Sequence, residues 1–303
     1  MTWGQPFVGT DSGPRMLRER GLLTDLTKLG WRVEDLNDLD FENMTNPAGS
    51  SPMVDPPNAR NCSMVGNAAQ ILADIVETKA REGRFPLMLG GDHSIGIGSL
   101  TGILRVRPET GIIWVDAHAD LNTPETSGSG NMHGMPLGLL LDLPIGEGGV
   151  DFSKLPGFDF LIDGPRFSPD QLVYIGLRDV DKPERDWIRK HNIKTFTMYD
   201  IDHLGIGKVM DEALDHLKDR PLHLSYDIDA VDPVLAPATG TKVRGGLTFR
   251  EAHFIAECVA QSGNLGSADI VEVNPTLSCD DGADETVELG LQLITSFMGK
   301  TII

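Results

Sequence analysis

Residues 111–120 read Gly111-Ile-Ile-Trp-Val-Asp-Ala-His-Ala-Asp120, an apolar run that passes directly into acidic residues and a histidine. The absence of polar alternation in the first five residues predicts a short strand buried on both faces. Comparable apolar runs lie at residues 85–89, 172–175, 222–226 and 269–273. Short strands of this kind are typical of a parallel sheet that is covered by helices on both sides.

Segments with helical periodicity lie between these runs, at residues 67–81, 181–190, 207–218 and 248–262. Strands that alternate with helices along the chain indicate βαβ units. We therefore predict an α/β fold with three α/β/α layers around a mainly parallel sheet. The long irregular stretches, residues 40–61, 122–134 and 144–169, do not have the composition of interdomain linkers. We accordingly expect residues 1–303 to form a single domain.

The composition excludes several classes of protein. Forty-five acidic residues against 26 basic residues give a formal net charge of −19, which opposes binding to nucleic acid. Three cysteines without a C-x-x-C pair favour neither a disulfide framework nor a thiolate zinc site, and they fit a reducing compartment. No apolar stretch approaches the roughly 20 residues of a membrane helix, and the N-terminus has no signal-peptide pattern. We expect a cytoplasmic protein with no nucleic-acid or membrane partner.

Polar clusters follow three of the predicted strands at the point where each strand ends. They read Gly90-Gly-Asp-His-Ser94, Asp116-Ala-His-Ala-Asp120 and Asp227-Ile-Asp-Ala-Val-Asp-Pro233. Carboxyl ends of parallel strands meet at one edge of a sheet, where open α/β folds bind ligands. Side chains two residues apart in an extended chain point the same way. The clusters therefore bring six candidate metal ligands together, namely His93, Asp116, His118, Asp120, Asp227 and Asp229.

Four carboxylates crowded at one edge would repel one another unless cations compensate them, and their charge matches two divalent ions. Carboxylate oxygens with two imidazoles and no thiolate favour Mn²⁺, with Co²⁺, Zn²⁺ and Fe²⁺ as alternatives. Any one of these residues, taken alone, is as well explained as a helix cap, a turn former or a core histidine. Their convergence from three strands predicts a two-metal centre, which can generate a hydroxide nucleophile near neutral pH.

These three clusters together resemble the ureohydrolase family of binuclear manganese enzymes, and within it the arginases. Residues 9–14, 122–134, 174–181, 237–241 and 270–275 resemble further arginase segments in the same order. The resemblance implies hydrolysis of L-arginine to L-ornithine and urea with two Mn²⁺ per chain, in a homotrimer or higher homo-oligomer. Tyr226 and Ala230 stand where Phe and Gly are common in the family, Ser127 stands where Thr is frequent, and Gly128 interrupts the hydroxyl run. None of these departures removes a predicted ligand.

The resemblance also implies a role for each metal ligand. One manganese ion would be held by His93, Asp116, Asp120 and Asp227, and the other by His118, Asp116, Asp227 and Asp229. Asp116 and Asp227 would bridge the two ions, and Asp120 would also orient the nucleophile.

Further residues are implied to handle the proton and the substrate. His133 would be the proton shuttle, a role that suits an imidazole because it titrates near neutrality. Glu272 would pair with the guanidinium group, with Thr241 assisting nearby. Asn122, Ser127 and Ser129 would read the α-carboxylate, and Asp181 and Glu184 the α-ammonium group.

The sequence leaves two alternatives to an arginase open. Another ureohydrolase, such as an agmatinase or guanidinobutyrase, would share all six ligands and differ in its substrate loops, and residues 122–134 favour arginine over these substrates. A non-catalytic relative would be expected to have lost one or more ligands, whereas all six are present here.

Overall fold

The computed structural model describes residues 1–41, 54–145 and 147–301. Its centre is a six-stranded sheet in the order β1-β6-β5-β2-β3-β4, and every neighbouring pair is parallel. The strands are β1 Leu87–Leu89, β2 Gly111–Val115, β3 Leu172–Leu177, β4 Lys194–Thr197, β5 Leu222–Asp227 and β6 Leu265–Val271. The predicted mainly parallel sheet is confirmed. β4 was not predicted, because it is an edge strand in which only Phe196 is buried and which lacks an apolar run.

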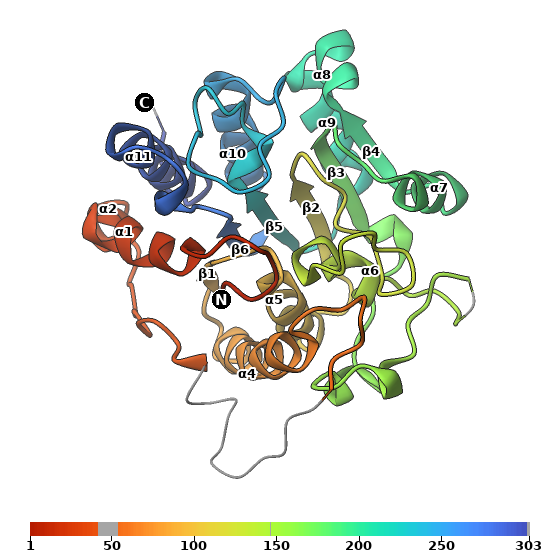
Figure 1. Cartoon of the computed structure of the whole chain (residues 1–303). Helices are drawn as coiled ribbons and strands as arrows, with labels where there is room; N and C mark the ends of the chain where they lie inside the picture. Colours follow the sequence, from red (N-terminus) through yellow and green to blue (C-terminus); the bar gives the residue numbers. More distant parts are fainter. Residues whose placement is uncertain (42–53, 146, 302–303) are drawn as a thin grey trace.

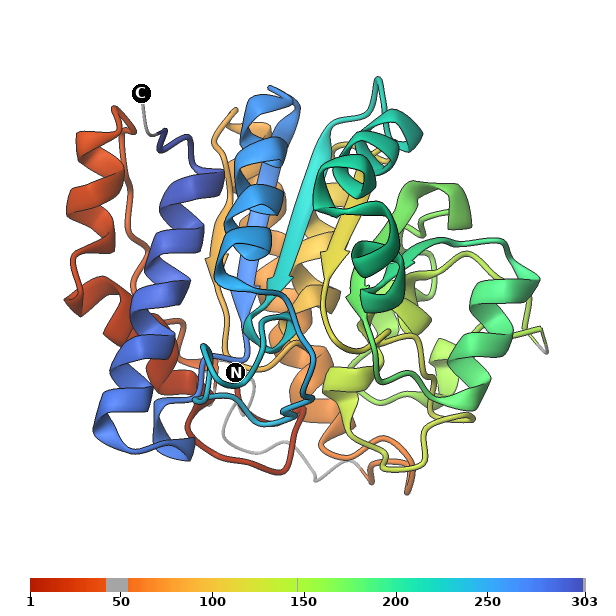
Figure 2. The ribbon, with the colours of Figure 1, turned by 90° about the horizontal axis from the view of Figure 1, so that it is seen from above.

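Helices cover both faces of this sheet (Figure 1). They are α1 Gly13–Glu19, α2 Leu22–Lys28, α4 Cys62–Arg81, α5 Ile95–Leu104, α6 Pro136–Leu140, α7 Lys182–Lys190, α8 Met198–Leu204, α9 Ile206–His216, α10 Phe249–Gln261 and α11 Asp280–Phe297. α4 and α5 lie on one face, and α9, α10 and α11 lie on the other (Figures 1 and 2). The four segments of helical periodicity correspond to α4, α7, α9 and α10. Helical periodicity does not mark α5, because all ten of its residues are buried and it has no polar face.

The side chains of β2 show why the apolar run lacks alternation. Ile113 and Val115 pack in a core with residues of α9, α10 and α11, whereas Ile112 and Trp114 pack in a second core with residues of α4, α5 and α6. Both faces of the strand are therefore buried, as a parallel sheet with helices on both sides requires.

The strand order places a topological switch between β2 and β5. The chain continues from β2 to β3 on one side and from β5 to β6 on the other, although β2 and β5 are neighbours. Asp116 directly follows β2, and Asp227 is the last residue of β5. In Figure 2 the arrowheads of both strands point towards the side where the N-terminal segment lies. A ligand site is expected outside the carboxyl ends of strands at such a point.

Two of the three stretches predicted to be irregular consist of loops and short turns. Residues 122–134 form a loop that closes on the short 3-10 turn η2, Met132–Gly134. The described residues between 144 and 169 include the short turns η3, Phe152–Lys154, and η4, Asp159–Leu161, and η5, Pro169–Gln171, begins at the end of this stretch. Most of residues 40–61 lie outside the described residues. The assignment of residues 1–303 to one domain stays a prediction. Within the described part of the chain, no helix is both long enough and apolar enough to cross a membrane.

Candidate metal centre and substrate site

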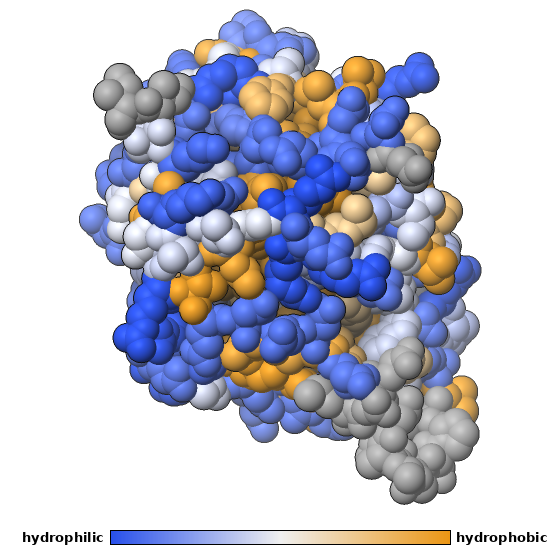
Figure 3. All heavy atoms as spheres, turned by 90° about the vertical axis from the view of Figure 1, so that its left-hand side faces the viewer, coloured by the Kyte–Doolittle hydropathy of each residue, from blue (hydrophilic) through white to orange (hydrophobic). Residues whose placement is uncertain are grey.

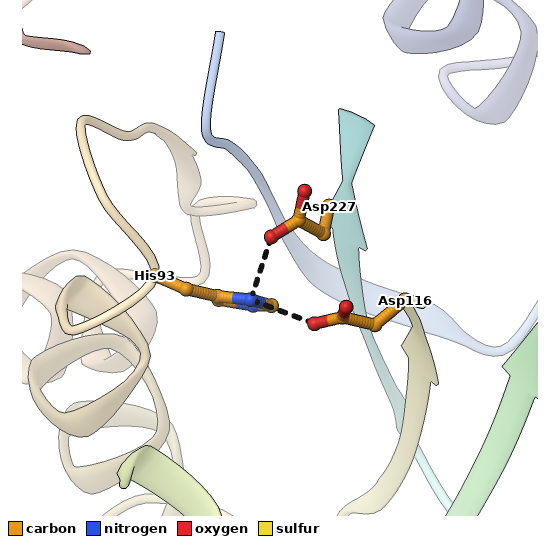
Figure 4. Close-up of side chains that lie close together, drawn as sticks. All are labelled: His93, Asp116 and Asp227. Carbon is orange, nitrogen blue, oxygen red and sulfur yellow. Dashed lines mark ion pairs between the residues drawn. The ribbon is translucent and has the colours of Figure 1, made fainter. Parts of the chain in front are cut away.

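His93 lies between β1 and α5, and its Nδ1 atom faces three carboxylates. The distances from Nδ1 are 3.0 Å to Asp116 Oδ2, 3.1 Å to Asp227 Oδ2 and 3.1 Å to Asp120 Oδ2; the first two pairs are drawn in Figure 4. None of the three oxygens is aligned for a hydrogen bond with Nδ1. Two ligand atoms that lie about 2.1 Å from one ion and 90° apart are separated by about 3.0 Å. The spacing around Nδ1 is therefore that of ligand atoms of one shared cation.

A buried hydrogen-bond chain fixes the orientation of the His93 ring. Its Nε2 lies 2.8 Å from Ser225 Oγ, and the Ser225 hydroxyl donates to Asp269 Oδ1 at 2.5 Å. Although burial opposes the shift, hydrogen bonds from His223 and Ser225 lower the pKa of Asp269, so this residue is an ionised acceptor. Because Ser225 donates to Asp269, its oxygen must accept the Nε2 proton of His93. In the neutral ring the lone pair of Nδ1 then points into the space between the carboxylates, where a bound cation would be stabilised.

A second group of ligand atoms surrounds His118. Its Nδ1 lies 3.2 Å from Asp229 Oδ2 and 3.3 Å from Asp116 Oδ1. Asp116 thus turns one oxygen to each imidazole and belongs to both groups that could hold an ion. Asp227 belongs only to the group around His93, so bridging by Asp227 stays a prediction. The structure brings all six predicted ligands together at the end of β2 and β5.

The pKa values of two of these carboxyl groups reflect uncompensated negative charge. Burial and the neighbouring carboxylates of Asp229 and Asp116 raise the pKa of Asp227 well above its usual range. Burial and the charge of Asp116 raise the pKa of Asp120 to about 6. A cation bound among these oxygens would remove both penalties, so the donor set fits a divalent metal ion.

Two of the predicted functional carboxylates occupy left-handed backbone conformations. The φ angle is 49° at Asp120 and 63° at Glu272, values that residues with a Cβ rarely adopt. Such strain persists only where surrounding contacts hold it, and it is concentrated at functional sites. Glu272 directly follows β6, and Asp120 is the last residue of the motif that follows β2.

Glu272 joins the metal ligands to the predicted proton shuttle. Its Oε1 accepts the backbone N–H of His93 at 2.9 Å and lies 3.1 Å from His133 Nδ1. Burial alone would lower the pKa of His133, but the hydrogen bond and the negative charge of Glu272 raise it to about 9. Thr241, which was predicted to assist near Glu272, donates its hydroxyl proton to Asp229 Oδ2 at 2.7 Å.

The loop after β2 and the start of α7 meet beside this centre. Asn122 Nδ2 donates to Asp181 Oδ2 at 3.0 Å, so the residues predicted to read the two ends of the amino-acid group are in contact. Glu184 is buried, and its carboxylate accepts the backbone N–H groups of Asp181 at 2.8 Å and Leu121 at 2.9 Å. Burial raises the pKa of Glu184 to about 7. The contacts of Glu184 tie α7 to the end of the Asp116–Asp120 motif.

Ser127 and Ser129 lie towards the outer part of the same loop. Ser127 Oγ accepts the N–H of Gly130 at 2.9 Å, and Ser129 Oγ accepts the N–H of Asn131 at 3.2 Å. Each hydroxyl can still donate its own proton. Ser129 is exposed and Ser127 half-buried, so both are accessible to a ligand that enters from solvent.

Comparison with known proteins identifies the family. The Arginase family profile matches residues 1–299. The chain belongs to the arginase family. The arginase of Neurospora crassa is 47% identical over 311 residues, which cover 99% of this chain and 84% of that protein. The human protein named "Arginase-2, mitochondrial" is 43% identical, with coverages of 98% and 82%. The crystal structure of Bacillus subtilis arginase is 38% identical with a TM-score of 0.86, and the match covers 100% of this chain and 97% of that one.

Family membership confirms the fold and the class of enzyme that the sequence predicts. The chain is a hydrolase that acts on a guanidinium C–N bond, and the arginase family is one of metal-dependent ureohydrolases.

Proposed function

We propose that this chain hydrolyses L-arginine to L-ornithine and urea at a centre of two Mn²⁺ ions. The observation that carries the proposal is the position of His93, whose Nδ1 lone pair faces three carboxylate oxygens because Ser225 and Asp269 hold the opposite nitrogen. Membership of the arginase family supplies the reaction class.

The six clustered side chains would hold the ions. His93, Asp116, Asp120 and Asp227 would bind one ion, and His118, Asp116, Asp227 and Asp229 would bind the other. Manganese is favoured because the donors are two imidazoles and four carboxylates, without a thiolate. Two bound divalent ions supply a hydroxide nucleophile near neutral pH and stabilise developing negative charge.

His133 and Glu272 would manage the proton and the guanidinium group. A pKa of about 9 keeps the imidazole of His133 protonated at neutral pH, with Nδ1–H directed to Glu272 Oε1. The proton on its other ring nitrogen is then available for the departing amine, which must be protonated as the C–N bond breaks. Glu272, fully buried beside the metal ligands, provides the negative charge that a guanidinium requires.

The α-amino-acid end of the substrate would bind between the 122–134 loop and α7. Asn122 with the hydroxyls of Ser127 and Ser129 would read the α-carboxylate, while Asp181, with Glu184 behind it, would read the α-ammonium group. The hydrogen bond between Asn122 and Asp181 supports this assignment, because it places an amide donor beside a carboxylate, as a zwitterion needs.

The test is urea release from L-arginine, agmatine and 4-guanidinobutyrate in parallel after Mn²⁺ loading. Polar loop groups left without their α-carboxylate cost roughly 1 to 3 kcal/mol each, so kcat/KM for arginine should exceed that for agmatine by about 10² or more. Equal values for arginine and agmatine would contradict arginine specificity, and no urea from any substrate would contradict the proposed reaction.

We extend the proposal to the state of the protein in the cell. The three cysteines are unpaired, which is consistent with the cytosol, although one curated relative carries the name mitochondrial. Tyr199, Val234 and Phe249 are exposed apolar side chains, which a second copy could cover in a homotrimer or higher homo-oligomer. Cell fractionation and light scattering of the purified protein test these two points.

A further inference from the structure

The N-terminal segment lies on the side of the sheet towards which the carboxyl ends of the strands point (Figures 1 and 2). The backbone of Gly4 holds it on both sides, since Gly4 N–H donates to Asp92 Oδ2 at 2.9 Å and Gly4 C=O accepts the N–H of His133 at 3.0 Å. Trp3 C=O also accepts from Asn61 Nδ2 at 2.8 Å. The next residue, Gln5, is consequently placed beside Glu272, 267 positions later in the chain.

The carboxamide of Gln5 has one partner and one free end. Its Nε2 donates to Glu272 Oε2 at 2.9 Å. Its Oε1 is buried and has no hydrogen-bond partner among the described residues. The opposite orientation of the amide would turn Oε1 towards a carboxylate, so the contact with Glu272 fixes which atom is the acceptor that remains. Only 6% of Gln5 is exposed, so an unpaired oxygen at this position is costly.

Glu272 alone has too few acceptor sites for a guanidinium. A carboxylate offers about four lone-pair positions, and Glu272 already accepts from His93 N, His133 Nδ1 and Gln5 Nε2. One position is left, on Oε2. A guanidinium presents its N–H donors in pairs, as a planar fork. A second acceptor must therefore come from another side chain, unless a present hydrogen bond is broken.

Gln5 Oε1 meets this requirement. It belongs to the same carboxamide that donates to Glu272 Oε2, so the two oxygens lie near each other. A Cβ atom at Gly240 would lie 2.9 Å from Gln5 Oε1, so the glycine leaves room beside this oxygen. The neutral oxygen of Gln5 beside the Glu272 carboxylate gives two acceptors with one negative charge, which matches the single positive charge of a guanidinium group.

We propose that Gln5 is a substrate-contacting specificity residue that accepts one N–H of the guanidinium group while its Nε2 holds Glu272 in place. This inference rests on the proposed function. It makes the N-terminal segment part of the substrate site, and it predicts that loss of Gln5 weakens ligands that carry a guanidinium while sparing those that do not.

The test compares L-arginine with L-ornithine, which has the same α-amino-acid end and no guanidinium group. In the Mn²⁺-loaded enzyme, Gln5→Met should raise KM for arginine about 10-fold or more, because it removes a hydrogen bond to a charged group. The inhibition constant of ornithine should change less than about 2-fold. Val8→Ala, an exposed change in the same segment, is the matched control and should alter neither constant.

A second variant approaches the same oxygen from the other side. Gly240→Ala places a methyl group against Gln5 Oε1 without replacing Gln5, so it too should raise KM for arginine selectively. Manganese content and thermal unfolding are measured for every variant, so that a folding or metal defect is recognised.

The results distinguish a failure of the Gln5 role from a failure of the proposed function. If Gln5→Met and Gly240→Ala both leave KM for arginine unchanged, or weaken ornithine as much as arginine, Gln5 serves only the architecture and the proposal is wrong. If the wild-type protein releases no urea from arginine, the proposed function fails, and the role of Gln5 fails with it.

Discussion

Ser225→Ala is the change that tests how the metal centre is held. Ser225 lies on β5 with no exposed surface, between His93 Nε2 and Asp269 Oδ1. The substitution removes the acceptor for the Nε2 proton and one donor to the Asp269 carboxylate. The ring proton of His93 can then move to Nδ1, where three carboxylate oxygens stabilise it. A protonated Nδ1 cannot bind a metal ion.

Ser225→Ala should lower both the stability of the fold and the affinity for metal. Leaving a buried polar group without its partner costs about 1 to 3 kcal/mol in the free energy of unfolding. Losing a hydrogen bond that orients a metal-binding histidine typically lowers metal affinity 10-fold to 100-fold, equivalent to about 1.4 to 2.8 kcal/mol. We therefore expect Ser225→Ala to be moderately less stable and to bind Mn²⁺ at least 10-fold more weakly.

Ser267→Ala provides the control. Ser267 is equally buried on neighbouring β6, and its Oγ lies 2.9 Å from His223 Nδ1 in the same hydrogen-bond network. Among the described residues, its hydroxyl pairs with His223 and not with a predicted ligand. Ser267→Ala should therefore lose about as much stability as Ser225→Ala and keep the Mn²⁺ affinity. Calorimetric titration with Mn²⁺ and denaturation of the metal-free proteins measure the two quantities. Equal Mn²⁺ affinity in Ser225→Ala and the wild type would refute the tautomer argument.

Four further predictions concern the ligands, the proton and the substrate. Asp116→Ala should leave fewer than one Mn²⁺ per chain, whereas Asp229→Ala should retain about one, because only Asp116 belongs to both groups of ligand atoms; elemental analysis decides this. His133→Asn should lower kcat by about 10² to 10⁴ with its manganese intact, and unchanged turnover across the pH profile would exclude the shuttle role. The raised pKa of His133 also stabilises the fold. This contribution is fully present below about pH 6.5 and is lost as the pH rises through about 9. In metal-free protein, the difference in free energy of unfolding between wild type and His133→Asn should therefore decrease from about pH 6 to about pH 10. Asp181→Ala should raise KM for arginine and leave activity on 4-guanidinobutyrate nearly unchanged; an equal loss on both substrates would remove Asp181 from the α-ammonium site.

The sequence predicts the fold and the centre of the site for the same physical reason. β2 is apolar until it reaches Asp116, and β5 ends on Asp227, because the sheet is buried on both faces and clustered acidic groups are admitted at its carboxyl edge. The abrupt change from apolar to acidic residues therefore marks both the end of the strand and the position of the ligands. Where this contrast is weak, as in β4, or where a helix is buried all round, as in α5, the sequence carries no such mark.

The partners that orient the ligands could not be predicted in this way. Asp269 begins the last predicted strand and resembles an ordinary polar residue there, yet it accepts from Ser225, Ser99 and His223 within the buried sheet. These contacts depend on strand register and on α5 packing across the sheet, neither of which is encoded in a local pattern. A buried acid within a strand that is otherwise apolar is the one signal that points to such a network.

The position of Gln5 beside Glu272 was likewise not predictable from a local sequence pattern. Gly4, the residue before it, explains how the segment comes so close. A Cβ atom at Gly4 would lie 2.5 Å from Asp92 Oδ1 and 2.8 Å from Ser94 Oγ, so only glycine allows the backbone to approach the β1–α5 loop this closely. That approach makes the hydrogen bonds from Gly4 to Asp92 and from His133 to Gly4, and these set the depth at which Gln5 enters the site. The segment is held by its backbone, so the Gln5 side chain is left to face Glu272. Gly4 and the buried amide of Gln5 thus place the N-terminal segment beside Glu272, at the proposed substrate site.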